Sequence, residues 1–533
     1  MKRIINILVT LIVAALVYYF TLPALNFHSI GIYIYIGFIA VFYGVISMIN
    51  DPNVKLVMKG KQLRFEDNAP IQLFIIIITI VAITALIVVI NFFSGPIFNA
   101  SKYQKRIYVN EDCSFENDIP EVNFNHLPLL DRDSSQVLGD RVMGQMNDLV
   151  SQFYVSNMYT QINYNDSIMR VTPLDYADIF KWLSNRKQGV PGYITVNSVN
   201  GESKLTRLDK GMKYTQSAYF NDNLYRKLRF KYLTENFDKI SFEIDNEGNP
   251  YYIVTTVKYV GVGLRAKVSG VIIFNPVTGE STKYKVEDIP EWVDVAYSAS
   301  LLIEQINDWG QYKNGFWNSM FGQKNVVSTT EGYNYLAMND DIYLYTGITS
   351  VVSDESNLGF ILSNMRTGET NYYSVAGAEE YSAMSSAEGQ VQDMGYKSTF
   401  PLLINLNGNP TYVVSLKDSS GLVKMYGFID VKDYQKVVVT DSSKGINVAK
   451  DNYIQNTKSE VKDEELIIEE VQVKSINTAI INGYTYYYIT TNDKKFKLSI
   501  SLGDKLAYIN IGDTIKIGYF ETEKDIKEVE RLY

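Results

Sequence analysis

Hydrophobic residues along this chain are concentrated in three uninterrupted runs, at residues 4–22, 30–49 and 73–93. Each run is about 20 residues long, the length of helix that crosses a hydrocarbon core of about 30 Å. None contains Asp, Glu, Lys or Arg. Because a helix satisfies every backbone amide within its own segment, we predict three transmembrane helices within residues 1–95. Their lack of charged groups indicates an anchor and not a transport pathway.

Basic residues beside these runs predict the orientation of the anchor. Six of them lie before the first run or between the second and third: Lys2, Arg3, Lys55, Lys59, Lys61 and Arg64. Three follow the third run: Lys102, Lys105 and Arg106. By the positive-inside rule, this multi-pass protein of the plasma membrane has a cytoplasmic N-terminus and an extracytoplasmic C-terminal region. A cleaved signal peptide is the alternative for the first run, but no A-x-A-like site follows it.

Beyond the anchor, short apolar strands alternate with turn residues, and three segments align without gaps. Residues 192–203, 270–281 and 359–370 each run from a Gly through apolar residues to an Asn, and then to a Gly-Glu pair. We interpret each as a β-hairpin in which the Asn side chain caps the turn and the second Gly takes a positive φ. The Glu is expected to be a solvated strand residue. A second pair, 245–254 and 405–414, shares a Gly-Asn-Pro strand start.

Helical periodicity precedes these strands four times. The segments are residues 134–153, 220–233, 293–309 and 378–394. Their spacing predicts four units, each a helix followed by three or four antiparallel strands. The predicted bounds of these units are 96–205, 206–290, 291–376 and 377–440. The expected fold class is a membrane-anchored α+β protein.

The hairpin turns resemble those of PepSY-type domains, in which a helix precedes an antiparallel hairpin and a strand ends in a D/N-x-x-T-G-E-like turn. The matching positions are 275–280 and 364–369, with 197–202 as a weaker copy. The fourth unit has residues 430–434 at this place and lacks the Gly-Glu step. The resemblance marks the second and fourth units as PepSY-like. It implies a role in restraining or assisting an extracytoplasmic protein, such as a peptidase.

The C-terminal part is interpreted as a linker and a small barrel. Residues 441–465 are rich in Ser, Lys, Asn, Asp and Glu, which predicts a linker. Residues 466–533 contain five strand patterns and are similar to an OB-like barrel. Such barrels often bind oligonucleotides or sugars, but a fold does not fix a function. Four tyrosines form either a binding platform or core, and strand alternation favours the core: Tyr484, Tyr486, Tyr487 and Tyr488.

Composition removes several classes of function. The net charge is -9 and no basic stripe is present, so a nucleic-acid partner is not expected. The single cysteine, Cys113, cannot form an intrachain disulfide and is interpreted as an incidental thiol. The two histidines, His28 and His126, are not part of a nucleophile-elbow or zinc-type pattern. The clusters 131–133 and 339–341 hold candidate Ca²⁺ ligands, but turn and cap chemistry explains them more simply. We therefore assign no catalytic, cofactor-binding or metal residue.

The chain is also similar to a group of large, uncharacterised membrane proteins of low-GC Gram-positive bacteria, in segments such as 315–318 and 332–335. This similarity implies no established activity. The favoured function is a membrane-anchored extracytoplasmic protein-binding or scaffold protein of the bacterial cell envelope that regulates an envelope or secreted protein. Its expected partners are the membrane and an extracytoplasmic protein, without a cofactor. The alternative is a cell-wall or peptide-processing enzyme, which requires a cleft of converging carboxylates with shifted pKa values.

Overall fold

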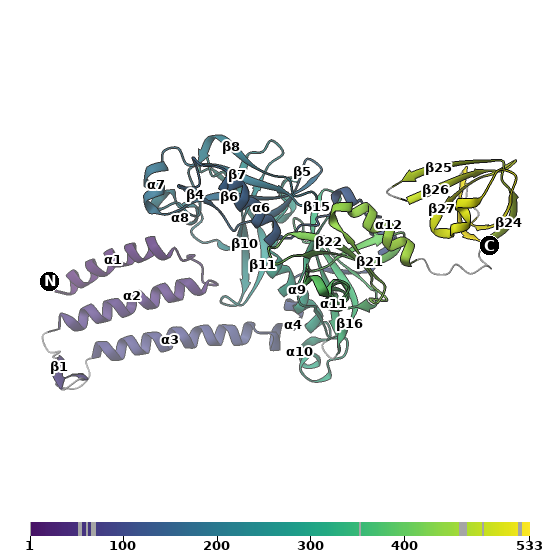
Figure 1. Cartoon of the computed structure of the whole chain (residues 1–533). Coiled ribbons are helices and arrows are strands. Elements are labelled where there is room, and N and C mark those ends of the chain that lie inside the picture. Colours follow the sequence, from purple (N-terminus) through teal and green to yellow (C-terminus); the bar gives the residue numbers. More distant parts are fainter. Residues whose placement is uncertain are drawn as a thin grey trace. The chain divides into compact units, whose positions relative to one another are not determined.

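The computed structural model describes residues 2–51, 56–59, 62–65, 71–350, 353–457, 466–481, 484–520 and 525–533. It divides into two compact units, Met1–Glu379 and Glu380–Tyr533. Figure 1 labels the helices and strands along the chain. Two of the basic residues used to predict orientation, Lys55 and Lys61, lie outside the described residues.

Three apolar helices open the chain, as predicted. They are α1 (Lys2–Thr21), α2 (Ile30–Ile49) and α3 (Ile71–Ser94), with mean hydropathies of 2.3, 2.2 and 3.4. Most of their large apolar side chains are exposed, which suits a lipid environment and not water. A short hairpin, β1 (Leu56–Lys59) and β2 (Gln62–Phe65), lies between α2 and α3.

The first sheet follows helix α6 (Arg132–Gly144) and is antiparallel. Its strands have the order β4-β6-β7-β8, with β5 also paired to β6. Their bounds are β4 Phe153–Val155, β5 Thr160–Tyr164, β6 Ser167–Tyr176, β7 Val190–Asn197 and β8 Ser203–Met212. Helix α7 (Ile179–Asn185) connects β6 to β7.

The second sheet follows helix α8 (Leu224–Lys231) and is an antiparallel meander in the order β12-β11-β10-β9. Its strands are β9 Asn236–Ile244, β10 Pro250–Val260, β11 Arg265–Phe274 and β12 Ser281–Tyr284. One hydrophobic core joins this sheet to the first, because Phe242 and Tyr252 pack with Tyr193 and Val171. The first and second predicted units therefore form a single packed body.

The third sheet follows α9 (Ala299–Tyr312) and has the order β13-β15-β16-β17-β3. Its hairpin strands are β13 Val327–Thr329, β14 Asn334–Met338, β15 Asp341–Ser350, β16 Ser353–Asn364, β17 Thr370–Tyr373 and β18 Gly377–Ala378. Strand β3 (Val109–Cys113) comes from just after the anchor and pairs in parallel with β17. The first unit was predicted to begin at residue 96, but β3, the first strand in that range, belongs to the third sheet.

The second compact unit contains two further sheets. After α11 (Glu380–Gln390) come β19 Lys397–Ser398, β20 Leu402–Leu406, β21 Asn409–Lys417, β22 Val423–Asp430 and β23 Val437–Asp441. The predicted linker over 441–465 is wrong in part, because Ile446–Thr457 forms helix α12. Its Ala449 and Tyr453 are buried, so a face of this polar segment packs as an ordinary helix does. Residues 458–465 lie outside the described residues.

The C-terminal sheet has the strand order β24-β28-β29-β27-β26-β25. Its strands are β24 Ile467–Gln472, β25 Ser475–Ile481, β26 Tyr484–Thr490, β27 Lys495–Ser499, β28 Thr514–Tyr519 and β29 Ile526–Leu532. Strands β27 and β29 run parallel, while the other neighbours are antiparallel. Only residues 473 and 474 separate β24 from β25, so the predicted first strand is split in two.

The three aligned hairpin turns have the geometry predicted for them. Asn197, Asn275 and Asn364 each accept two backbone N–H groups on the side-chain oxygen. The glycines at 201, 279 and 368 have φ of 78°, 79° and 77°. The following Glu residues are exposed. Shared turn chemistry explains these matches, and the grouping into PepSY-like units stays a prediction.

Helix ends were predicted less well than helix positions. The segment 134–153 is helical only to Gly144, and Phe153 pairs with Tyr176 in the sheet. The segment 293–309 becomes helical six residues late, at Ala299, because Ser298 caps the helix by accepting from the Leu301 amide.

Candidate functional site

A cleft of about 630 Å³ lies between the first two sheets of the Met1–Glu379 unit. Three structures form its walls: the first sheet with its edge strand β8, the turn between β9 and β10, and the turn after β11. The first sheet contributes Tyr164, Met169, Tyr193, Thr195, Lys204, Thr206, Arg207, Leu208, Asp209 and Lys210. The turns contribute Ile244, Glu247, Gly248, Asn249, Pro250, Asn275, Val277 and Thr278.

Strand β8, which lines the cleft, is the edge strand of its sheet. Its only strand partner among the described residues is β7. Five successive residues, 206–210, line the cleft, and successive strand side chains point to opposite faces. Thr206 and Lys204 pair with Tyr193 and Thr195, so these lining side chains share one face of the sheet, and the cleft extends from that face to the β8 edge. The β7–β8 register shifts between the Gly192–Arg207 and Val190–Met212 pairs, so residues 208–211 bulge from the ladder.

The opposite wall is held by hydrogen bonds from the first sheet to the β9–β10 turn. The Tyr193 hydroxyl donates to the Gly248 carbonyl oxygen at 2.8 Å. Asp245 accepts from the Asn249 amide at 2.8 Å and from the Glu247 amide at 3.1 Å. Burial raises the pKa of Tyr193 to about 12, so its hydroxyl stays a donor at neutral pH. The cleft is thus bounded by fixed backbone on this side.

Thr195 is the polar group in the cleft that is left without a partner. Its side chain lines the cleft from β7 and is only 3% exposed. Its hydroxyl has no hydrogen-bond partner among the residues that the structure describes. A buried hydroxyl without a partner costs about 1–3 kcal/mol.

The charges around the cleft are of both signs. Lys204, Arg207 and Lys210 are exposed on β8, and the acids of the lining are Asp209 and Glu247. Arg207 is already engaged, because its guanidinium donates to both carboxylate oxygens of Asp148 at 3.0 and 2.9 Å. Apolar side chains such as Met169 and Leu208 lie among them. This mixture suits an occupant with backbone amides and alternating polar and apolar side chains.

Two buried carboxylates of raised pKa lie outside the cleft lining. Glu243 on β9 accepts from the amides of Asp294 and Val295 at 2.8 and 3.1 Å, and Asp294 accepts from the Asn163 amide at 2.9 Å. Burial raises the pKa of both carboxyl groups, and their mutual repulsion raises that of Asp294 further. They connect β5, β9 and the segment before α9, which makes them structural groups.

The residues singled out from sequence have structural roles. Asp131 caps α6 by accepting from the Ser134 amide, and Asp341 forms an ion pair with Arg366 at 2.7 Å. No group of three potential ligands that could hold a metal occurs in the described part of the chain. The imidazole Nδ1 of His28 lies 2.7 Å from the Gly261 carbonyl oxygen. Cys113 is half-buried, and burial followed by nearby acids raises the pKa of its thiol.

Of the clustered tyrosines, Tyr487 packs against the core of the C-terminal sheet, as strand alternation favoured. The ring of Tyr486 faces Lys497, whose ammonium lies 4.6 Å from its centroid.

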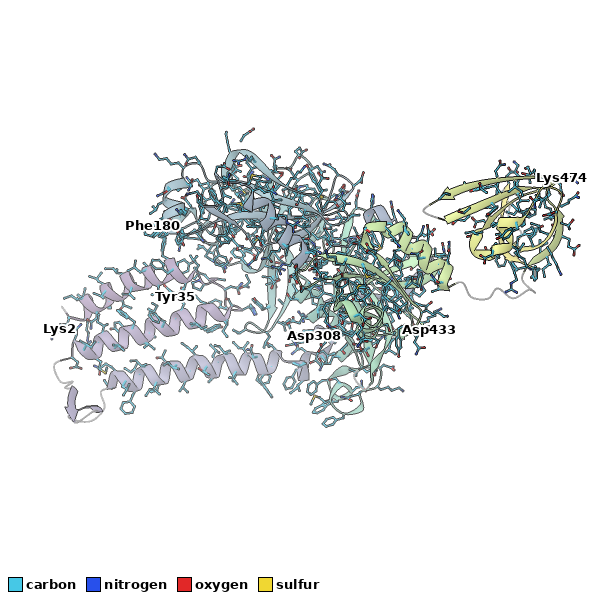
Figure 2. The ribbon with its side chains drawn as sticks, viewed as in Figure 1. Lys2, Tyr35, Phe180, Asp308, Asp433 and Lys474 are labelled. Carbon is cyan, nitrogen blue, oxygen red and sulfur yellow. The ribbon has the colours of Figure 1, made fainter. Side chains whose placement is uncertain are left out.

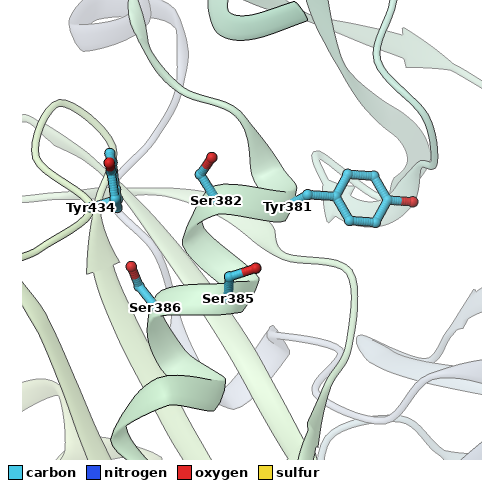
Figure 3. A pocket seen from close by; sticks show the side chains of 5 residues that line it. All are labelled: Tyr381, Ser382, Ser385, Ser386 and Tyr434. Carbon is cyan, nitrogen blue, oxygen red and sulfur yellow. The ribbon is translucent and has the colours of Figure 1, made fainter.

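A second hollow, of about 410 Å³, lies in the Glu380–Tyr533 unit (Figure 3). It is lined by Tyr381, Ser382, Ser385 and Ser386 of α11 and by Tyr434. Hydroxyl groups need an adjacent base or a lowered pKa to become nucleophiles, and the described residues of this lining include no His, Asp, Glu or Lys. The cleft beside β8 is therefore the stronger candidate for a functional site.

No protein-family model matches the chain, and no curated protein matches it. Among solved structures, an alpha-L-arabinofuranosidase from Lactobacillus brevis is similar over 72% of this chain and 94% of its own. The sequence identity is 8% and the TM-score is 0.15, so this likeness carries no argument about fold or function.

Proposed function

We propose that this chain is a membrane-anchored, extracytoplasmic protein-binding or scaffold protein of the bacterial cell envelope. The cleft along β8 takes an extended segment of a partner protein. The observation that carries the proposal is the position of β8 at the end of its sheet, with five successive residues, 206–210, in the lining of the cleft. An extended peptide that adds to a sheet edge gains affinity from backbone hydrogen bonds and specificity from pockets for its alternate side chains.

Side chains around β8 support a peptide occupant. Leu208, Ile244 and Val277 provide apolar contacts. Exposed lysines also protect edge strands from unwanted pairing, so Lys204 and Lys210 make the edge selective for a segment whose acidic side chains meet them.

The proposed location follows from the three apolar helices and the basic residues that flank them. In this proposal the N-terminus is cytoplasmic and the sheets are extracytoplasmic. The second and fourth units are PepSY-like, and the bound segment belongs to an envelope or secreted protein that this chain regulates. We also propose that the C-terminal sheet closes into an OB-like barrel. Strands β24 and β25 are nearly continuous in the chain but lie at opposite ends of the strand order. The parallel pairing of β27 with β29 supports the same proposal.

The enzyme alternative lacks a specific observation in its favour. It requires carboxylates of shifted pKa that converge in a cleft. Glu243 and Asp294 have raised pKa values, but neither belongs to the lining of the cleft.

The test uses a photo-crosslinking amino acid in the full-length protein in intact cells, placed singly at Lys204 or Lys210. The matched control position is Arg141, which is exposed on α6 and lies outside the cleft lining. The proposal predicts a crosslinked protein of reproducible mass from both cleft positions and none from Arg141. Thr206→Trp, which fills the cleft, is expected to reduce the yield at least several-fold without lowering the amount of protein. Equal products from Arg141, or no product from either cleft position, would contradict the proposal.

A further inference from the structure

Exposed apolar side chains gather on two short segments of the sheet-rich region. Five of them define what we call the α7–α8 patch: Phe180, Leu183, Phe220, Phe230 and Leu233. Phe180 is 72% exposed and Leu183 is 50% exposed. Figure 2 labels Phe180 at the margin of its domain. An exposed apolar patch rimmed by polar residues marks a protein or membrane interaction site.

The patch is continuous with the end of α1. The Tyr19 hydroxyl donates to the side-chain oxygen of Asn221 at 3.0 Å, next to Phe220. The ring of Phe230 lies 6.1 Å from that of Tyr18 and 6.2 Å from that of Tyr19. On the far side, Phe220 packs against Trp182 of α7 at 5.8 Å. The patch thus extends from α1 through α8 to α7.

The contacts of the patch with Tyr18 and Tyr19 of α1 fix its depth in a bilayer. Helix α1 ends at Thr21, so Tyr18 and Tyr19 lie within its last turn. Tyrosines at the end of a membrane-spanning helix sit at the level of the lipid headgroups. Phe220 and Phe230, which lie beside these tyrosines, are therefore at the same level. The Leu25 amide, just beyond α1, donates to the Leu233 carbonyl oxygen at 2.8 Å and fixes the other end of the patch.

Basic residues outnumber acids beside the patch. Residues 178–188 and 220–235 contain three acids, Asp178, Asp222 and Glu235, and seven basic residues: Lys181, Arg186, Lys187, Arg226, Lys227, Arg229 and Lys231. Arg186 is paired with Asp222 at 3.7 Å. Arg226 and Arg229 are used internally, by Tyr19 and by backbone carbonyl groups, and Lys231 donates to Ser281. Lys187 and Lys227 are exposed, and Lys181 is half-exposed. Basic residues at this level attract anionic headgroups, and long lysine stems reach them from an apolar surface.

We propose that the α7–α8 patch rests in the interfacial layer of the bilayer leaflet around the C-terminal end of α1. Its aromatic and leucine side chains lie at the boundary of the acyl chains, and its lysines contact anionic headgroups. The occupant is lipid, because the patch continues a lipid-exposed helix at the level of the headgroups and has exposed lysines beside it. The inference depends on neither the partner of the cleft nor the side of the membrane on which the sheets lie.

The experiment uses full-length protein with Cys113→Ser, reconstituted in vesicles of phosphatidylcholine with a minority of phosphatidylglycerol. Single nitroxide labels are placed by Phe180→Cys and Leu183→Cys. Leu11→Cys on α1 is the lipid reference, and Asp166→Cys is the water reference, because Leu11 is exposed on α1 and Asp166 is exposed in the β5–β6 turn. Electron paramagnetic resonance then compares the access of oxygen, which concentrates in lipid, with that of a water-soluble nickel chelate.

The proposal predicts that labels at 180 and 183 resemble the label of Leu11→Cys. Their ratio of oxygen access to nickel access should be several-fold above that of Asp166→Cys. Replacing phosphatidylglycerol by phosphatidylcholine is expected to raise nickel access at both positions. Labels at 180 and 183 that match Asp166→Cys would overturn the proposal. So would dipolar broadening at these positions that disappears on dilution with unlabelled protein, because it would show that a second copy covers the patch.

Discussion

Arg106 is the buried cation that connects the segment after the anchor to the second and third sheets. It follows α4 (Pro96–Gln104), and its side chain is only 1% exposed. It forms ion pairs with Asp308 and with Glu304, the latter at 2.5 Å, and its Nε donates to the Ala266 carbonyl oxygen at 3.1 Å. Asp308 is equally buried, at 2% exposure. We predict that Arg106→Met strongly destabilises this unit.

The magnitude follows from what the substitution leaves behind. Removing one partner of a buried ion pair costs about 3–5 kcal/mol, because the other charge remains buried. Arg265 still approaches Asp308 at 3.3 Å, and Glu304 is 34% exposed and can be hydrated. We therefore expect a loss near the lower end, about 3 kcal/mol. Replacing both charges, in Arg106→Met with Asp308→Leu, is expected to recover much of this loss because no charge is then left buried.

Tryptophan fluorescence during denaturant unfolding in detergent is the appropriate assay. All four tryptophans are in the Met1–Glu379 unit: Trp182, Trp292, Trp309 and Trp317. Burial raises the pKa of Asp308 despite its arginine neighbours, so the folded state binds its proton more tightly than the unfolded state does. Stability of the single variant should therefore fall more steeply than that of the native protein as pH rises above about 4. A loss below about 1 kcal/mol, or a double variant no more stable than Arg106→Met, would refute the reasoning.

Three further predictions concern other buried contacts. Asn91→Leu removes two side-chain hydrogen bonds to the Val262 backbone, at 2.7 and 3.1 Å, and should increase amide exchange at the tip of the β10–β11 hairpin by about tenfold or more. Glu243→Gln removes a carboxyl group whose raised pKa lowers stability as pH rises above about 4.5, so its unfolding free energy should vary less with pH over that range. Gly279→Ala should lower stability by about 1 kcal/mol more than Gly201→Ala in thermal unfolding; their φ values match, but only the Cβ at 279 meets a tyrosine ring, at 2.5 Å.

The anchor and the turns could be predicted from sequence because their physics is local. A helix in lipid needs only an apolar run of sufficient length. The turns at Asn197, Asn275 and Asn364 need only a capping amide and a residue that tolerates positive φ. In the fourth unit, Asp430 accepts the amides two and three residues after it, as the three asparagines do, although the Gly-Glu step is missing. The capping side chain therefore defines this turn.

The candidate site was missed because it depends on distant pairings. The position of β8 at the end of its sheet is set by the strands that pair elsewhere, and Thr195 lacks a partner only because of the packing around it. The one local signal was the presence of three basic residues, Lys204, Arg207 and Lys210, within one strand, which is typical of an edge strand. Helix α12 was missed for a related reason, since two buried residues, Ala449 and Tyr453, pack an otherwise polar segment.

The central proposal is that three helices hold the sheets on the side of the membrane opposite the N-terminus. Single cysteines in the Cys113→Ser protein test it, one at Lys2, the first residue of α1, and one at Asp166, in the β5–β6 turn. A membrane-impermeant maleimide applied to intact bacterial cells should label Asp166→Cys fully and Lys2→Cys only after the cells are permeabilised. Labelling of Lys2→Cys in intact cells, with Asp166→Cys protected until permeabilisation, would contradict the claim.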